Sequence, residues 1–497
     1  MKILKVFTMG CQKLFYTVCF SLLVVSCNDK KPDAADVLSG EYWKTQAMCD
    51  IIPYWTRYSQ NERSGTFHTN LDSVWKPFGS TEIYPSMISR HLFSYSATYL
   101  LSGKEEDIKI AERTAAWLIE KAWDKEWGGW YDSLDEKGNP AETTKTTFVQ
   151  VYVNTGLALY YFVTRDSLVL DYIDRSNDLL ETKVWDTGGS GGYFNTMNRD
   201  WSISDRNKSF SSQITPVSGY LFYLYLATRD QKFLDQTFKI LDIVSKRMVD
   251  TEYGWVLEDF NKEWKYISSR NDDSEVNIGH NIETAWMMLR YWFLASDEGI
   301  RTAGLKITDK ILRSGVFNEN DVWLSTAGRT EPLMPGSDTY WWIQAYGNMI
   351  SLCLYKATGD NKYLDYFTRG ARLWDSAFVD RRHGDTFFRI DSAGNVLDRT
   401  KAGRFKSSYH NMEHCLLNYL YLNLWVTCEP VILHFRISSS EDGENLYPVP
   451  IEDRNIRIVK ATNPGKENES LATAGQAIIL PADKNYRVTV ELAGCSE

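Results

Sequence analysis

Two kinds of apolar and polar pattern alternate along the chain. In 104–122 the apolar residues recur every three or four positions and charged residues take the other face, which predicts a helix with one buried stripe. In 217–226 (VSGYLFYLYL) no polar stripe is present, which predicts a helix buried on all sides. The chain is therefore expected to alternate between outer and inner helices.

This alternation occurs six times. In each unit a turn is followed by an aromatic residue, at Phe67, Trp130, Tyr193, Trp255, Trp323 and Phe387, so the successive spacings are 63, 63, 62, 68 and 64 residues. Such a period indicates a repeat architecture. An open solenoid usually leaves one face of each helix exposed, so the all-apolar inner helices favour a closed all-α (α/α)6 barrel of six helical hairpins over 40–428.

The pattern changes in 429–497. Short β-branched runs at 431–437, 457–460 and 486–490 lie between Gly, Asn and Pro turns, which predicts a small β-rich C-terminal module. This segment carries no candidate chemistry.

The N-terminus has the pattern of a secretory signal. Three lysines precede an apolar run at 14–25, which is too short to span a bilayer. The sequence Leu-Val-Val-Ser-Cys ending at Cys27 resembles the bacterial lipobox, and this resemblance implies cleavage after residue 26 and lipidation of Cys27. We therefore expect 1–26 to be a lipoprotein signal peptide and 27–39 a tether. The protein would be an extracytoplasmic lipoprotein, periplasmic or cell-surface, held on a bacterial membrane by lipid alone. A signal peptide without lipidation is the alternative.

Composition narrows the range of partners. The formal charge is −10 and no long basic run occurs, which argues against nucleic acid. Aromatic residues make up 14% of the chain, with 18 Trp and 29 Tyr, and their flat, half-polar surfaces suit sugars as well as cores. The cysteines beyond Cys27 are few and odd in number, so we expect most of them to be buried thiols and no disulfide framework. They are Cys49, Cys353, Cys415, Cys428 and Cys495.

A polar residue recurs once per repeat near the start of each inner helix. The set is Arg90, Gln150, Gln213, His280, Gln344 and His410. In a closed barrel the inner helices are parallel, so their N-terminal ends meet at one mouth and favour a negative charge there. Convergent polar groups on an aromatic rim that includes Trp130, Trp341 and Trp342 predict a ligand pocket.

Two histidines are the candidates for proton transfer, because His280 and His410 occupy corresponding repeat positions. Glu283 lies one helical turn after His280 and can orient the imidazole or act on substrate. Arg90 is suited to clamp an anion or a hydroxyl group. Each also has a structural alternative: a buried ion pair for Glu283 and Arg90, a satisfied core group for each histidine, and a loop hydrogen bond for Gln150.

One short motif indicates different chemistry. Residues 410–414 (HNMEH) fit the inverted zinc-protease pattern H-x-x-E-H, with His410 and His414 one helical turn apart. Such a site needs a third ligand, and five residues match by chance in a long chain. We therefore expect no metal.

Residues 279–286 (GHNIETAW) resemble the G-H-[ND]-I-E-x-[SA]-W signature of the N-acylglucosamine 2-epimerase and cellobiose 2-epimerase family. Further segments resemble family motifs in the same order, so that the similarity covers 41–426. They are Arg90 with Phe93, 128–135 (GGWYDSLD), 192–201 (GYFNTMNRDW), 341–345 (WWIQA) and 409–411 (YHN).

The resemblance implies an (α/α)6 barrel that interconverts reducing sugars at C2, by epimerisation or aldose–ketose isomerisation, without a metal or other cofactor. It assigns His280 and His410 as the acid–base pair, with Glu283 assisting ring opening and Arg90 stabilising an enediolate. The expected partner is a mono- or oligosaccharide; oligomeric state is left open. The substrate-binding set expected around it is Trp341, Trp342, Gln344, Gln213, Gln150, Trp130 and His414.

The chain also departs from the family pattern. Ser211 and Gln213 stand where the family often has Asn and His, Phe148 replaces a Tyr, Tyr346 replaces a Glu, and His414 is an additional imidazole. The histidine pair is kept while the expected sugar contacts differ. Two other functions therefore stay open: a glycoside hydrolase using Glu283 and Glu413, or a carbohydrate-binding lipoprotein without catalysis.

Overall fold

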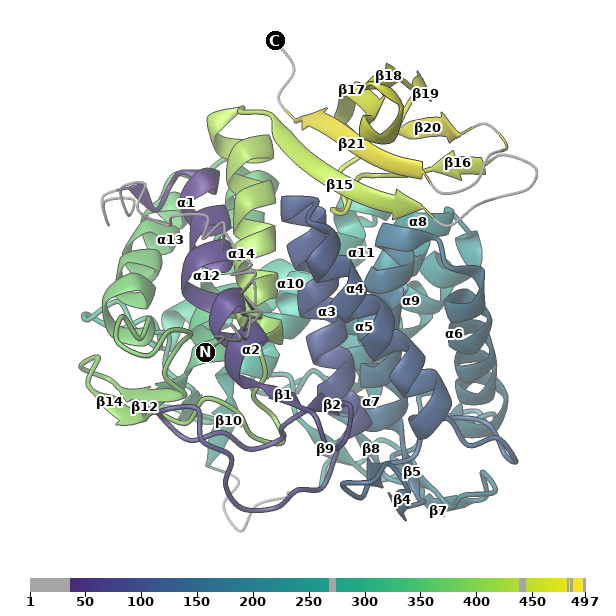
Figure 1. The fold of residues 1–497 in the computed structure, drawn as a ribbon. Coiled ribbons are helices and arrows are strands. Elements are labelled where there is room, and N and C mark those ends of the chain that lie inside the picture. Colours follow the sequence, from purple (N-terminus) through teal and green to yellow (C-terminus); the bar gives the residue numbers. More distant parts are fainter. Residues whose placement is uncertain (1–35, 268–273, 438–443, 481, 483–485, 495–497) are drawn as a thin grey trace, which may run out of the picture.

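The computed structural model describes residues 36–267, 274–437, 444–480, 482 and 486–494. The predicted signal peptide, Cys27 and Cys495 lie outside these ranges. Within them, six outer and six inner helices alternate around a closed ring (Figure 1), which confirms the predicted (α/α)6 barrel.

The inner helices form a continuous ring in which each packs against the next, and α14 packs against α3 to close it. They are α3 (Pro85–Ser102), α5 (Thr147–Thr164), α7 and α8 (Phe210–Gln213 and Phe222–Thr228, with η5 Val217–Leu221 between them), α10 (Ile278–Ala295), α12 (Trp341–Thr358) and α14 (Tyr409–Tyr421, continued by η8 Leu422–Thr427).

The outer helices each carry one buried stripe. They are α1 and α2 (Gly40–Thr45 and Ile52–Tyr58, joined by η2 Gln46–Ile51), α4 (Glu105–Trp117), α6 (Ser167–Leu179), α9 (Gln231–Ile243), α11 (Glu298–Arg313) and α13 (Lys362–Leu373). Four of them end in a π turn: η3 (Leu118–Ala122), η4 (Leu180–Val184), η6 (Val244–Met248) and η7 (Trp374–Phe378). By contrast, α3 is buried at every position from Pro85 to Leu101, as expected for an inner helix.

Short strands gather at the N-terminal ends of the inner helices (Figure 1). The strand just before an inner helix pairs with the loop of the following repeat, as β5 does with β6, so that successive repeats are tied together. The strands are β1 (Gln60–Asn61), β2 (Thr66–Phe67), β3 (Ser133–Leu134), β4 (Pro140–Glu142), β5 (Lys145–Thr146), β6 (Thr196–Met197), β7 (Ile203–Asp205), β8 (Lys208–Ser209), β9 (Asp259–Phe260), β10 (Glu275–Asn277), β11 (Thr326–Gly328), β12 (Asp338–Tyr340), β13 (Arg389–Asp391) and β14 (Val396–Asp398).

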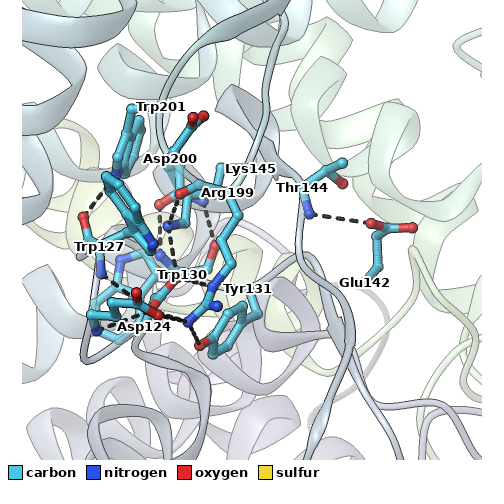
Figure 2. A network of polar contacts seen from close by, with 12 residues as sticks. Asp124, Trp127, Trp130, Tyr131, Glu142, Thr144, Lys145, Arg199, Asp200 and Trp201 are labelled. Carbon is cyan, nitrogen blue, oxygen red and sulfur yellow. Dashed lines mark hydrogen bonds and ion pairs between the residues drawn. The ribbon is translucent and has the colours of Figure 1, made fainter.

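A partly buried ionic network fixes the loop between the second and third repeats. Figure 2 shows Lys145 and Arg199 directed at the carboxylate of Asp124, with Nζ–Oδ2 and Nε–Oδ2 distances of 3.0 and 2.8 Å. Burial alone would raise the pKa of Asp124, but the hydrogen bonds from Arg199 and Lys145 hold it well below its usual range. Trp201 Nε1 donates to Trp127 O at 2.9 Å. The R-D-W segment at 199–201 therefore holds the barrel rim together.

In two repeats the turn before the aromatic residue is Gly-Gly, and the second glycine is required for steric reasons. Gly129 and Gly192 have φ angles of 75° and 83°, a region that favours glycine. A Cβ on Gly129 would lie 2.3 Å from the indole of Trp201, and one on Gly192 would lie 2.5 Å from Trp264. Glycine is required because an indole packs directly on the turn.

The C-terminal module lies at the end of the barrel opposite the short strands (Figure 1). One sheet has the order β15 (Val431–Ile437), β21 (Tyr486–Ala493), β17 (Arg457–Asn463) and β18 (Glu469–Ser470); the other has β16 (Glu444–Leu446), β20 (Ala477–Leu480) and β19 (Ala472–Ala474). A 3₁₀ turn, η9 (Pro464–Lys466), follows β17. β15 packs on α3 and α5.

A buried ion pair joins this module to the barrel interior. Arg290 of α10 donates to both carboxylate oxygens of Glu452, at 2.9 and 2.6 Å, and both side chains are only 1% exposed. Asp453 accepts from Trp425 Nε1 at 3.0 Å and pairs with Lys356 at 2.9 Å. The segment 448–453 is buried, so the module closes the far end of the barrel.

The thiols follow the prediction in part. Cys353 and Cys415 are buried free thiols, as expected. Cys428 is an exception, because it is disulfide-bonded. Cys428 sits in a left-handed conformation just after η8, where the last inner helix ends. Among the helices described, none is both long and apolar enough to cross a membrane.

Candidate functional site

A cavity of about 870 Å³ opens at the mouth where the inner helices begin. Its lining combines aromatic rings with a few polar groups, as ligand pockets do. The inner-helix side chains that contribute to it include Arg90, Tyr152, His280, Glu283, Trp342 and His410, and the loops at 325–326 and 336–338 form one side.

His280 is held at the start of α10. Its backbone N–H donates to the side chain of the N-cap residue Asn277 at 3.1 Å, which satisfies one of the open donors of the helix end. Its imidazole stacks on Phe210 with centroids 4.0 Å apart and an interplanar angle of 13°. Nδ1 is hydrogen-bonded to the carboxylate of Glu258. A carboxylate at Nδ1 fixes the tautomer and orientation of the ring.

His410 is held more deeply, on the second position of α14. Its ring contacts Trp341, Tyr346 and Tyr409 at centroid distances of 5.8, 5.4 and 4.6 Å, and its side chain is 9% exposed. Burial, with the positive charge of Arg90 as a second cause, holds the pKa of His410 well below its ordinary value. The imidazole is therefore neutral in the resting protein.

One indole ring lies close to both imidazoles. The Trp342 ring lies 5.6 Å from the His280 ring and 6.2 Å from the His410 ring, centroid to centroid. A Cβ at Gly279 would lie 2.3 Å from Trp342, so the glycine before His280 lets this indole pack against α10. Both histidines consequently line the same cavity.

Arg90 and Glu283 complete the charged part of the lining. Arg90 donates from Nη1 to Phe405 O at 3.2 Å, and its guanidinium lies 3.9 Å from the centroid of Tyr152. Its Nε is buried without a partner among the residues described, so the group keeps capacity for a ligand oxygen. Burial raises the pKa of Glu283, against the opposing influence of His280.

The three glutamines do not lie with these groups. Gln150 accepts from Trp130 N–H at 2.8 Å and donates to Trp130 O at 2.6 Å. Gln213 holds Tyr193 in the same way at 3.0 and 2.8 Å. Gln344 accepts from Trp323 N–H at 3.0 Å and donates to Gly370 O at 3.0 Å. All three are buried, and none lines the cavity in the described part of the chain. Their assignment to substrate binding is therefore corrected to loop binding.

The physical reason is an offset of one residue. Asn281 binds the backbone of Val256 at 2.8 and 3.1 Å, as the glutamines bind theirs. The residue that faces the cavity is the one before it, His280. His410 likewise precedes Asn411, which binds Asp385 and Thr386. The predicted set of six polar residues, one per repeat, therefore mixed residues that face the cavity with residues that bind a loop, because both kinds recur with the same spacing.

Two other predicted contacts also lie in the core. Trp130 is fully buried and donates from Nε1 to Asn154 at 3.2 Å. His414 is fully buried between Trp43 and Trp374, at centroid distances of 4.6 and 4.5 Å. Burial lowers the pKa of His414 to about 3. Neither residue lines the cavity, so both are corrected to core residues.

The zinc pattern does not form a ligand set. His410 faces the cavity while His414 is enclosed by indoles. Across the described ranges, no group of three or more His, Cys, Asp or Glu is placed to hold a metal ion.

Glu258 is the functional candidate that the sequence did not single out. It lies two residues after Val256, at the repeat position filled by Asn195 and Ser325. At this position the backbone carbonyl accepts from the first residue of an inner helix, as Glu258 O does from Phe210 N–H at 2.7 Å and Asn195 O from Thr147 N–H at 2.9 Å. No local signal singled it out, because the equivalent position carries Phe388 in another repeat, where Phe388 O accepts from Trp341 N–H at 3.2 Å, and a second acid, Asp132, stands two residues after Trp130.

Comparison with known proteins gives consistent matches. The family model described as N-acylglucosamine 2-epimerase matches residues 38–414. A cellobiose 2-epimerase of Bacteroides fragilis is 25% identical over 386 residues, covering 74% of this chain and 95% of that protein. A D-mannose isomerase of Thermobifida fusca is 20% identical over 288 residues, covering 54% of this chain and 68% of that protein.

The fold agrees with these matches. The structure of a cellobiose 2-epimerase from Bacillus thermoamylovorans superposes with a TM-score of 0.69 and 22% identity, covering 77% of this chain and 98% of that one. Because the family model spans most of the chain and both histidines lie within it, this protein belongs to the N-acylglucosamine 2-epimerase family.

Proposed function

We propose that the protein is a cofactor-independent sugar 2-epimerase or aldose–ketose isomerase, acting on a reducing mono- or oligosaccharide in the 870 Å³ cavity. The observation that carries the proposal is that two imidazoles line one cavity and contact the same indole, Trp342. The relatives named as cellobiose 2-epimerase and D-mannose isomerase support both reaction types.

The chemistry follows from the open-chain sugar. The C1 aldehyde acidifies C2–H, and an imidazole is a suitable base near neutral pH. Removal of the proton by one histidine and delivery by the other, from the opposite face, inverts C2. Delivery at C1 instead gives the ketose. Arg90 supplies positive charge to the cis-enediolate between these steps.

Ring opening and sugar binding use the remaining lining. Burial raises the pKa of the Glu283 carboxyl, which favours its protonated form and suits it to donate a proton to the ring oxygen. The partly exposed face of Trp342 offers an apolar surface to the sugar, while Trp341 is buried.

The glycoside hydrolase alternative is less well supported. It needs two carboxyl groups on either side of the scissile bond. Glu283 lines the cavity, but Glu413 is 1% exposed and does not belong to the lining among the residues described.

The test is proton exchange at C2. Purified protein is incubated in D2O with mannose, glucose, N-acetylmannosamine, cellobiose and mannobiose, and the sugars are followed by NMR. Deuterium at C2 together with a second epimer or a ketose is the expected result. Cleavage products would indicate a hydrolase instead, and binding without exchange a non-catalytic lectin.

We further propose that the protein is a lipoprotein held outside the cytoplasm through Cys27. The basic and apolar pattern of 1–26 supports this, and a disulfide at Cys428 fits an oxidising compartment. Radiolabelled palmitate should enter the wild-type protein and not Cys27→Ser, and the variant should leave the membrane fraction. Equal fractionation of the two proteins would overturn the assignment.

A further inference from the structure

A buried carboxyl group lies directly behind His410. Glu413 follows it by one turn of α14, and its Oε2 is 3.7 Å from His410 Nδ1. Both atoms are buried and lack a hydrogen-bond partner among the residues described. The other oxygen, Oε1, accepts from Tyr409 OH at 3.1 Å. Since buried polar atoms are almost always paired, the two orphaned atoms call for a proton between them, which a small side-chain movement would allow.

The surroundings determine how many protons this pair holds. Burial raises the pKa of Glu413 to about 8, and the positive charge of Arg290 opposes this rise without cancelling it. Burial lowers the pKa of His410 well below its ordinary value. Both pKa shifts favour a protonated Glu413 beside a neutral His410 over an ion pair between them.

Several other charged or titratable groups face the pair. They are Arg90 of α3, Glu283 of α10, Tyr346 of α12 and Tyr409 of α14 itself. The second carboxyl group, Glu283, raises the pKa of Glu413, whereas Arg90 and the Tyr409 hydroxyl lower it. None of these groups fills the space between Nδ1 and Oε2.

We propose that Glu413 is a positioning residue whose protonated carboxyl donates to Nδ1 of His410, so that His410 presents Nε2–H to the sugar and acts as the acid partner of His280. This inference rests on the proposed sugar epimerase or isomerase function. It concerns the division of labour between the two histidines.

The proton transfers balance in this arrangement. When the enediolate is protonated, the Nε2–H bond breaks and the C2–H bond forms. The Glu413 proton moves to Nδ1 at the same time, so the imidazole stays neutral and Glu413 becomes the carboxylate. Without this second transfer His410 would have to become an imidazolate anion in a buried site. Solvent then returns a proton to Nε2 of His410, the Nδ1 proton moves back to Glu413, and solvent takes the proton that His280 had removed.

His280 has a different partner. Glu258 is 25% exposed at its side chain and is hydrogen-bonded to Nδ1 of His280, and in the proposed tautomer it accepts from Nδ1–H. This leaves the basic lone pair of His280 at Nε2. The two carboxyl groups therefore set opposite tautomers, with His280 as base and His410 as acid.

Glu413→Gln tests the assignment, because the amide keeps the shape and a donor for Nδ1 but cannot transfer a proton. The two C2 epimers of an active sugar are incubated separately in D2O. For the epimer whose C2–H faces His280, we expect exchange to continue while inversion falls about 100-fold, the lower range of a general acid–base contribution. The other epimer should neither exchange nor invert. The reciprocal variant Glu258→Gln should lose exchange with the first epimer.

Wild-type inversion in Glu413→Gln, or an equal loss of exchange for both epimers, would overturn the proposal. The ¹⁵N NMR spectrum of histidine-labelled wild-type protein reports the tautomer of His410 directly. This test does not depend on whether Glu413→Gln folds. His410, assigned by its loss in His410→Gln, should have a protonated Nε2 and an unprotonated Nδ1 at neutral pH; a protonated Nδ1 overturns the pairing. If the wild type exchanges no sugar, the proposed function fails while this spectrum still reports on the pair.

Discussion

The two imidazoles of the cavity differ in what holds their Nδ1 atoms. His280 is bound to a partly exposed carboxylate and stacked on Phe210, whereas His410 is buried among aromatic rings with Glu413 behind it. A site that must remove a proton from one face of a sugar and deliver it to the other benefits from such a difference, because one group must begin without the proton and the other with it.

Removing either imidazole should stop exchange at C2. We expect His280→Ala and His410→Ala each to lower the rate of C2 inversion by at least about 100-fold, measured by NMR in D2O. His434→Ala is the matched control, because His434 lies on β15 in the module at the opposite end of the barrel. Full activity in either cavity variant would contradict the roles given to the pair.

The rate of inversion should depend on the protonation of Glu413. Its pKa is raised to about 8 by burial, and the proposed role requires the protonated form. Inversion should therefore be retained at neutral pH and fall as the pH rises through about 8. Glu413→Gln should lack this alkaline decline, since an amide does not titrate. A decline of the same shape in both proteins would assign it to another group.

At the scale of helices and loops, the sequence predicted the barrel because its signals are local. An apolar stripe or its absence distinguishes an outer from an inner helix. Five inner helices end at a residue in the left-handed conformation, namely Gly103, Arg165, Arg229, Ser296 and Gly359. Asp166 and Asp230 then cap the next outer helix with their side chains.

The candidate site was less predictable because neighbouring residues on one helix face opposite ways. His280 faces the cavity and Asn281 faces the loop, yet both are polar and both recur with the repeat. The contact between Glu258 and His280 joins a loop to a helix 22 residues later, and no local pattern indicates it. Long-range contacts of this kind appear only when the loops are placed.

The glutamine contacts lead to a prediction about stability. Gln150→Ala would leave the N–H and C=O of Trp130 buried and unpaired. We expect a loss of about 2–6 kcal/mol of unfolding free energy, from about 1–3 kcal/mol for each of the two orphaned groups, measured by urea unfolding. Gln231→Ala, on the exposed first turn of α9, should change it by less than about 0.5 kcal/mol. Loss of sugar binding in Gln150→Ala without loss of stability would restore the original substrate-binding assignment.

At the scale of the whole molecule, the ring of helices is closed where the first and last repeats meet, and one end of the barrel is covered. The first and last repeats are joined by hydrogen bonds from Trp75 Nε1 to His383 O at 2.7 Å and from Trp374 Nε1 to Gln46 Oε1 at 2.9 Å. The C-terminal module covers the end of the ring opposite the cavity (Figure 1). A ligand therefore has access to the inner helices from the mouth where both histidines lie.

The attachment of the C-terminal module to the barrel depends on the buried Arg290–Glu452 ion pair, so the stability of the protein should depend on both charges. Glu452→Gln keeps the shape of the side chain but leaves the guanidinium of Arg290 buried without a counter-charge. Breaking such a pair costs about 3–5 kcal/mol, so we expect a marked fall in the thermal unfolding temperature, with activity per folded molecule unchanged. Replacing both residues, as Arg290→Met with Glu452→Leu, should recover most of that stability, because an apolar pair has no charge to desolvate. If the double variant were as unstable as the single one, the loss would come from packing at 448–453 and not from the unpaired charge.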